Sequence, residues 1–146
     1  MPEKLQPFLH DLELVFRAPT QAWSDRDGQI RAGDSGQATV QGVMHSDVRV
    51  LSEAVLEVAG KEPEPAGSWH DGAALVLVGL PRNVDGPGAD PTTRLTRTRR
   101  VEAGSMQEEI EFSCATGGPV TAEVTVRLAA DLVPMEAVKS GFPADP

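Results

Sequence analysis

Short segments that alternate apolar with polar residues, cut apart by glycine and proline, constrain this chain to a β fold. In residues 106–114 the side chains of Ile110, Phe112 and Cys114 share one face, and Glu109 and Glu111 share the other. Such period-two alternation is typical of a strand with one buried face. Glycine and proline supply 14 and 12 of the 146 residues and recur between these segments. The sequence therefore predicts an all-β fold: an antiparallel β-sandwich, supersandwich-like, of seven to nine or more strands with little or no helix.

The two most regular segments, residues 106–114 and 120–128, are separated by Thr116-Gly117-Gly118-Pro119. Two amphipathic strands joined by a Gly-Gly turn predict a β-hairpin with one solvated face. Its inward face is expected to carry Ile110, Phe112, Cys114, Val120, Ala122, Val124, Val126 and Leu128.

Further strands are expected along the chain. Residues 12–17 place Leu12, Leu14 and Phe16 on one face, and Asp25-Arg26-Asp27-Gly28 is expected to be a hairpin-type turn. Residues 73–80 are apolar on both faces, which predicts a central strand, and residues 61–67, with two prolines, predict an edge or a loop. We expect a flexible lead-in over residues 1–11, one β-sandwich domain over residues 12–141 and a tail over residues 142–146.

Charge and composition exclude several classes of partner. The formal net charge of −9 argues against binding to nucleic acid or to an anionic membrane surface, since both need a basic patch. The longest apolar run, residues 73–80, is far shorter than the about 20 residues of a membrane-spanning helix. A single cysteine, Cys114, cannot form an intrachain disulfide. No secretory signal is seen at the N-terminus, so a cytoplasmic protein is expected.

The sequence contains no recognisable catalytic constellation. His10, His45 and His70 lack the spacing of metal ligands, and no phosphate-binding or nucleophile motif is present, so neither metal nor cofactor is expected. Glu109, Glu111 and Glu123 share the polar face of the predicted hairpin. We interpret them as a solvated sheet face and not as the carboxylate pair of a glycosidase.

Two groups of charged residues are candidates for more specific roles. Arg94, Arg97, Arg99 and Arg100 form the basic cluster of the chain, and we expect them to pair with glutamates on a neighbouring strand. Asp47 and Arg49 lie two residues apart, hence on one face of an extended chain, where they could pair with each other or anchor a neighbouring surface.

Residues 42–52 resemble a segment of a known family, the bacterial glycogen debranching enzymes of the amylo-α-1,6-glucosidase type, whose N-terminal domain opens with the pattern G-L-Y-x-x-D-T-R-x-L-S. Residues 129–141 are similar to the family's A-D-F-A-D-M-F-E-V-R-G, with Lys139 in place of the arginine. Residues 23–28 resemble its S-D-x-x-G turn, and residues 97–101 its R-x-R-x-V strand. The four segments occur in the family's order and span residues 12–141. The matching positions include Gly42, Asp47, Arg49, Leu51, Ser52, Asp131, Met135, Glu136, Val138 and Gly141.

The resemblance implies a division of labour. Family members carry this β-sandwich in front of a much larger (α/α) barrel, which holds the catalytic carboxylates and hydrolyses α-1,6 branch linkages of glycogen. We therefore expect a non-catalytic chain, truncated before an absent barrel that is its main partner, and able to form a homodimer through its exposed face. The candidates for interface or ligand contacts are Asp47, Arg49, Arg97, Arg99, Asp131 and Glu136.

Two other functions stay open. The chain could be a stand-alone carbohydrate-binding β-sandwich module for an α-glucan, with Trp69, beside His70 and Asp71, as the stacking platform. Such modules usually present several exposed aromatic rings, whereas this chain has two tryptophans, Trp23 and Trp69, and no tyrosine. It could also be a free-standing enzyme with an unfamiliar site, which activity on a glycan would reveal.

Overall fold

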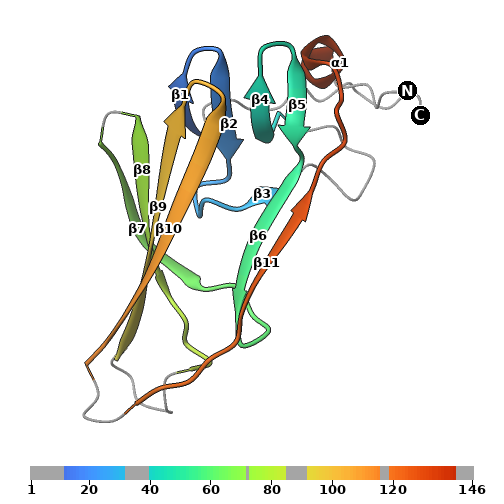
Figure 1. Cartoon of the computed structure of the whole chain (residues 1–146). Coiled ribbons are helices and arrows are strands. Elements are labelled where there is room, and N and C mark those ends of the chain that lie inside the picture. The colour runs from blue at the N-terminus through green and yellow to red at the C-terminus, as the bar shows by residue number, and fades with distance from the viewer. Residues whose placement is uncertain (1–11, 32–39, 72, 85–91, 116–118, 141–146) are drawn as a thin grey trace, which may run out of the picture.

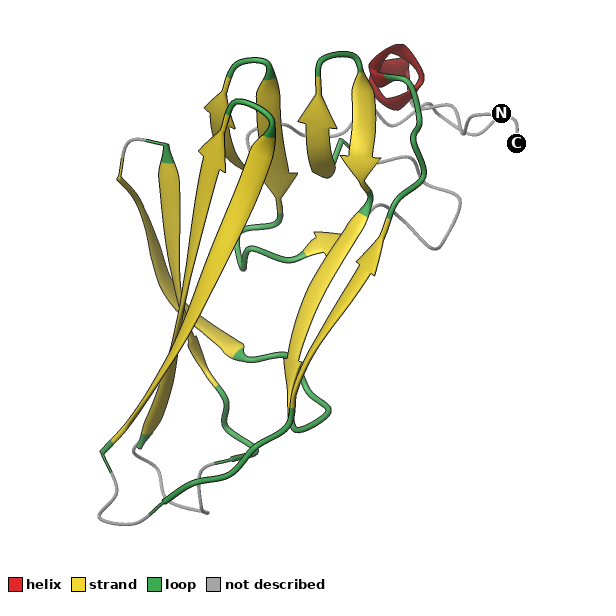
Figure 2. Cartoon of the chain, viewed as in Figure 1, coloured by secondary structure: helices red, strands yellow, loops and turns green. Residues whose placement is uncertain are grey.

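The computed structural model describes residues 12–31, 40–71, 73–84, 92–115 and 119–140. Within these residues the chain forms eleven strands and one short helix (Figures 1 and 2). All strand pairs between named strands are antiparallel, and the strands group into three sheets. The predicted all-β, sandwich-like fold with little helix is confirmed. The expected lead-in, residues 1–11, and the expected tail, residues 142–146, lie outside the described residues.

Each sheet combines strands from distant parts of the sequence. The first has the order β1-β2-β4-β5, the second β10-β9-β8-β7 and the third β11-β6-β3. The first contains β1 (Glu13–Arg17), β2 (Thr20–Ser24), β4 (Gly42–His45) and β5 (Val48–Leu51). The second contains β7 (Glu64–Asp71), β8 (Ala74–Leu80), β9 (Thr93–Glu102) and β10 (Ser105–Cys114). The third contains β3 (Ile30–Arg31), β6 (Glu53–Val58) and β11 (Val124–Ala129), and α1 (Met135–Ser140) follows.

The core lies where the three sheets meet. In Figure 1 the β7–β10 sheet lies on one side, the β6–β11 pair on the other, and the β1–β2 and β4–β5 hairpins close the upper end. One cluster of buried apolar side chains draws on all three sheets, because each sheet has an apolar face that must be covered. Its members are Val15, Ala22, Ile30, Val43, Ala54, Leu75, Leu77 and Val101.

The predicted hairpin between residues 106–114 and 120–128 is wrong. β10 pairs with β9 over its whole length, from Ser105↔Glu102 to Cys114↔Thr93, and β11 pairs with β6. The β9–β10 turn is very short and places Gly104 at a φ of 94°, so it closes the smallest possible loop. The expected Gly-Gly turn itself, residues 116–118, lies outside the described residues.

Two apolar rows are less buried than their pattern suggests. In β1 the buried residue is Val15, 2% exposed, on the face opposite to Leu14 and Phe16, and Phe16 is 59% exposed. Cys114 is exposed and Phe112 is 41% exposed. Both lie toward the end of β10, where the second and third sheets diverge (Figure 1).

Other local predictions are confirmed. The N–H of Gly28 donates to the carbonyl of Asp25 at 2.9 Å, and Gly28 has a φ of 84°, so the predicted turn forms. It does not close a hairpin, because β2 pairs with β1 and β4 whereas β3 pairs with β6. β8 lies between β7 and β9, as expected of a segment that is apolar on both faces. The proline-containing segment 61–67 leads into β7, the terminal strand of its sheet.

Gly42 allows β4 to approach β5 closely. Its φ is 143°, and a Cβ atom there would lie 2.5 Å from Cδ of Arg49 and 2.7 Å from the carbonyl oxygen of Leu51. We expect Gly42→Ala to lower the free energy of unfolding by about 2–3 kcal/mol, since both the backbone and the neighbours must shift. Urea denaturation of the purified chain measures this change.

Gly67→Ala is the matched control, because a Cβ atom at Gly67 meets nothing within 4 Å. We expect its unfolding free energy to stay within about 0.5 kcal/mol of the parent chain. Equal effects of the two substitutions would contradict the close approach at Gly42.

Candidate functional site

Two arginines of β9 point into the core and share one carboxylate. The inward row of β9 is Thr93, Leu95, Arg97, Arg99 and Val101, all buried. Arg97 donates from Nε and Nη2 to Glu108 of β10 at 2.8 and 3.2 Å, and Arg99 donates from Nε to the same carboxylate at 2.7 Å. The expectation that the arginines of residues 94–100 pair with a glutamate on the neighbouring strand is confirmed for Arg97 and Arg99.

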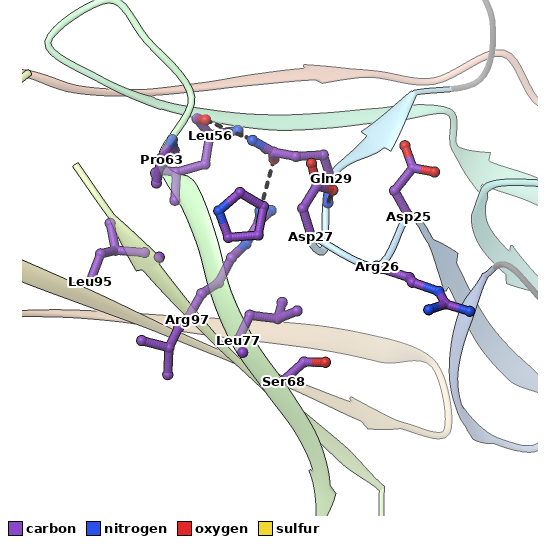
Figure 3. Close-up of a pocket in the computed structure, with 14 residues that line it drawn as sticks. Asp25, Arg26, Asp27, Gln29, Leu56, Pro63, Ser68, Leu77, Leu95 and Arg97 are labelled. Atoms are coloured by element: carbon purple, nitrogen blue, oxygen red, sulfur yellow. Dashed lines mark hydrogen bonds between the residues drawn. The ribbon is translucent and has the colours of Figure 1, made fainter. Parts of the chain in front are cut away.

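The remaining contacts of this buried cluster reach the other sheets. Arg99 donates from Nη2 to the carbonyl of Gly28 at 2.6 Å, and Arg97 donates from Nη1 to Oε1 of Gln29 at 2.8 Å. The Gln29 amide in turn bonds both the N–H and the C=O of Leu56 in β6, each at 2.8 Å (Figure 3). Nη1 of Arg99 is buried with no hydrogen-bond partner among the described residues. The cluster thus connects the second sheet to the third through side chains.

Burial and neighbouring charges shift the pKa values of Glu108 and Arg99 in opposite directions. Burial alone would raise the pKa of Glu108, but the adjacent charges and hydrogen bonds of Arg99 and Arg97 outweigh it and hold that pKa below its usual value. Burial lowers the pKa of Arg99, and the charge of Glu108 opposes this shift only in part. Arginine nevertheless stays protonated at any physiological pH. Glu108 is therefore held as a carboxylate.

A pocket of about 620 Å³ lies beside this cluster (Figure 3). Asp27, Gln29 and Arg97 line its polar side, and Leu77 and Leu95 belong to its apolar side. A glycosidase needs a carboxylic acid that remains protonated, which requires a raised pKa. Glu108, which pairs with the pocket residue Arg97, has its pKa shifted in the opposite direction. The pocket thus has the polarity to hold a small polar molecule, while the carboxylate beside it is unsuited to donate a proton.

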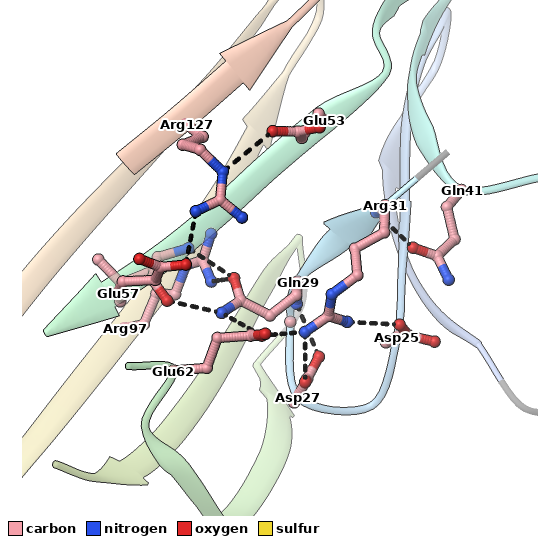
Figure 4. Close-up of polar contacts among 12 residues, drawn as sticks. Asp25, Asp27, Gln29, Arg31, Gln41, Glu53, Glu57, Glu62, Arg97 and Arg127 are labelled. Carbon is pink, nitrogen blue, oxygen red and sulfur yellow. Dashed lines mark hydrogen bonds and ion pairs between the residues drawn. The ribbon is translucent and has the colours of Figure 1, made fainter. Parts of the chain in front are cut away.

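Arg31 pairs with three carboxylates, two of which, Asp25 and Asp27, line the pocket (Figure 4). It pairs with Asp25 at 2.8 Å, with Asp27 at 3.3 Å and with Glu62. Burial lowers the pKa of Arg31, and the charges of Asp27 and Glu62 more than compensate, so that the pKa is raised. These acids are therefore engaged within the domain.

Arg49 and Asp131 bring together two of the four segments that carry the sequence resemblance, residues 42–52 and 129–141. The Arg49 side chain is 8% exposed and donates from Nε and Nη2 to the two oxygens of Asp131 at 3.1 and 2.5 Å. Its Nη1 donates to the carbonyl of Gln41 at 3.2 Å. This fork geometry is the strong, bidentate form of the ion pair. We call the Arg49–Asp131 pair the clamp.

The backbone reinforces the clamp. The N–H of Arg49 donates to the carbonyl of Val133 at 2.9 Å, and the N–H of Met135 donates to the carbonyl of Asp47 at 2.6 Å. Burial raises the pKa of Asp131, but hydrogen bonds from Arg49 and from the N–H of Val133 outweigh it and lower that pKa. The segment between β11 and α1 is therefore fixed to β5.

The other residues predicted to contact an interface or a ligand lie apart from one another in the structure. Asp47 is exposed just before β5, and its carbonyl, not its carboxylate, makes the bond to Met135. Glu136 is exposed in the first turn of α1. Trp69 is 52% exposed on the terminal strand β7, while Trp23 is partly buried beside Met44. Arg97 and Arg99 are inside the domain and do not contribute to its exposed surface.

Glu108 and Gln29 are members of the buried cluster that the sequence did not predict. Glu108 has the same parity as Ile110 in β10, so a glutamate on an inward row, opposite an arginine-rich segment, was the available signal. Gln29 follows the predicted turn, and nothing in the sequence marks its amide as a bridge to β6. Among the described residues, no group of three or more His, Cys, Asp or Glu side chains could hold a metal ion. No helix of the described part is long and apolar enough to cross a membrane.

Removing the shared carboxylate should destabilise the fold strongly. In Glu108→Gln the buried charges of Arg97 and Arg99 lose their counterion, and we expect the free energy of unfolding to fall by about 3–5 kcal/mol. Glu109→Gln, on the exposed face of the same strand, is the control and should change it by no more than about 0.5 kcal/mol. Chemical denaturation of both variants at neutral pH measures the difference. Equal stability of the two would refute the role of Glu108.

The lowered pKa of Glu108 also fixes the pH dependence of stability. The folded chain keeps this carboxylate ionised at pH values where the unfolded chain protonates it. The contribution of ionised Glu108 to the free energy of unfolding is therefore complete above the ordinary glutamate pKa of about 4.3. It is lost as the pH falls through the lowered pKa of the folded chain. We expect the stability gap between the parent chain and Glu108→Gln to narrow on acidification below about pH 4. A gap that is constant across this range would contradict the assignment.

Comparison with known proteins gives one match. A family model described as the N-terminal domain of some glycogen debranching enzymes matches residues 15–145. No curated protein and no solved structure matches the chain.

Proposed function

The chain belongs to the family of N-terminal domains of some glycogen debranching enzymes, and on this premise we propose that it is a non-catalytic, cytoplasmic domain that supports a catalytic (α/α) barrel. The barrel would hydrolyse the α-1,6 branch linkages of glycogen. The β-sandwich would serve as its folding support and shape one side of its substrate cleft.

The clamp is the observation that carries this proposal. A domain that supports a following domain must fix the direction in which its own chain leaves the last strand. Here the bidentate Arg49–Asp131 pair and the backbone bond from Arg49 to Val133 seat that segment on β5. Val138 of α1, 2% exposed, then packs with Met44 and Trp23. The segment after β11 is thereby held as part of the domain.

The charged side chains support a structural role in a second way. The carboxylates of Glu108 and Asp131 are each bound by arginine and have lowered pKa values. A general acid for glycoside cleavage would need the opposite shift. These carboxylates are suited to hold elements together and unsuited to proton donation.

A stand-alone carbohydrate-binding module is the alternative function, and the exposure of Trp69 is the observation that favours it. Sugar rings stack on exposed indole faces. Trp69 lies on the terminal strand β7 opposite Val76, next to the hydrogen bond between His70 and Glu13. An isolated chain that binds glycogen, and loses that binding in Trp69→Ala, would favour this alternative over the supporting role.

The complete gene product tests the supporting role. We expect the reading frame beyond Pro146 to encode several hundred residues of a helical barrel, and a stop codon there would overturn the proposal. We expect the isolated chain to release no glucose from glycogen.

In the complete enzyme, Arg49→Lys should replace the bidentate pair by a single contact, at a cost of about 1–3 kcal/mol in stability. The half-life of activity on heating should therefore shorten, while the KM for glycogen stays unchanged.

Arg127→Lys is the matched control for this experiment. Arg127 is 51% exposed and pairs with Glu57 and Glu53 on the surface of the third sheet, where ion pairs contribute little. We expect its half-life to match that of the parent enzyme. A raised KM in Arg49→Lys, with an unchanged half-life, would assign the clamp to substrate binding and contradict the supporting role.

A further inference from the structure

The strand β11 ends the third sheet and leaves one edge without a neighbouring strand among the described residues. We propose that β11 pairs with the β11 strand of a second copy of this chain, antiparallel and centred on Val126. The pairing would join two three-stranded sheets into one continuous sheet across a two-fold axis. This inference does not rest on the proposed function, and either can fail without the other.

Two backbone hydrogen bonds show which groups of β11 face outward. The carbonyl of Glu123 accepts from the N–H of Ala59 at 2.7 Å, and the carbonyl of Ala129 accepts from the N–H of Ser52 at 2.8 Å. Odd-numbered residues of this segment therefore direct their backbone groups toward β6. Because these directions alternate along an antiparallel strand, the N–H and C=O groups of Val124, Val126 and Leu128 point to the outer edge.

The side chains of the same three residues form an uncovered apolar row. In the β6–β11 register, Val124 lies opposite Val58, Val126 opposite Leu56 and Leu128 opposite Ala54. Those β6 residues are at most 2% exposed, whereas the β11 residues are 39%, 41% and 66% exposed. The apolar row of the core thus continues onto β11 and remains open to solvent there.

The terminal strands of the second sheet carry features that discourage pairing, and β11 does not. β7 contains Pro65 and a register shift between Pro65 and Gly67. β10 carries the exposed Glu109 and Glu111. Prolines, bulges and charges of this kind prevent edge-to-edge association. β11 has neither proline nor bulge, and its one charged residue, Arg127, is already paired with Glu57 and Glu53.

The sequence of β11 fits a second copy of itself. With Val126 opposite its own counterpart, Val124 lies opposite Leu128 and Thr125 lies opposite Arg127. This register satisfies all the outward backbone groups of the three apolar residues and continues the apolar row across the axis. No like charges face each other, since Arg127 meets a threonine. The assembly also closes, because the opposite edge of the sheet is β3, a strand of only two residues.

Sedimentation equilibrium of the full 146-residue chain tests the dimer. We expect a mass of twice 15.5 kDa at high micromolar concentration. Val126→Pro removes an outward N–H and leaves the bonds to β6 in place, so it should weaken dimerisation by about tenfold or more. Val126→Lys should do the same, while the control Phe16→Lys, which replaces an exposed apolar residue on β1, should leave the dimer intact.

Disulfide trapping tests the register. In a Cys114→Ser background, Val126→Cys should form an interchain disulfide on mild oxidation, because hydrogen-bonded antiparallel partners lie about 5.5 Å apart between Cα atoms. Leu128→Cys should not, because its partner is Val124. A chain that stays monomeric at all concentrations overturns the proposal. This holds both if β11 remains uncovered and if another segment of a longer polypeptide covers it. Trapping of Leu128→Cys in preference to Val126→Cys overturns it as well.

Discussion

The carboxylate of Glu108, shared by Arg97 and Arg99, is the interaction on which the packing of the three sheets depends. Two guanidinium groups stand in a row that otherwise carries Leu95 and Val101, and their burial is tolerable only because Glu108 compensates their charge. From this centre, hydrogen bonds run to Gly28 and through Gln29 to β6. Burial of apolar side chains stabilises the contact between the sheets but is not directional. The hydrogen bonds of this cluster are directional and therefore fix how the three sheets are placed relative to one another.

The clamp uses the same chemistry at the other end of the domain. Arg49 and Asp131 are 82 residues apart, and their pairing seats the segment after β11 on the β4–β5 hairpin. Gly42 makes room for the arginine stem, since a side chain there would collide with it. The supporting function proposed for this family member therefore depends on polar contacts that are local in space and distant in sequence. The open edge of β11 is a separate property, because it lies in a sheet too narrow to cover its own apolar row.

Prediction from the sequence succeeded where short-range rules decide the outcome. Alternation identified the strands, composition excluded a helical fold, and Asp25–Gly28 formed the expected turn. The order of four motifs identified the family that the comparison shows. It failed on β10 and β11, because each amphipathic strand has an apolar face that fits any apolar partner. The short loop between β9 and β10 gave β10 a nearer partner than the Gly-Gly segment offered. In the candidate site, the pairing of the β9 arginines with a glutamate was foreseen, but Glu108 and Gln29 as the particular partners were not.

By itself, the sequence determined that this chain is built of short antiparallel strands, because periodicity and turn residues are properties of neighbours along the chain. It also indicated that arginines of residues 94–100 pair with a glutamate, without distinguishing Arg97 and Arg99 from Arg94 and Arg100. Only the tertiary structure decided that Glu108 is the shared carboxylate and that Asp131 and not Asp47 binds Arg49. It also decided that β11 pairs with β6 and has no second neighbouring strand within the described part of the chain. These outcomes depend on which faces meet when three sheets pack, and that is settled by the combined burial and hydrogen bonding of the whole domain, not by any one segment.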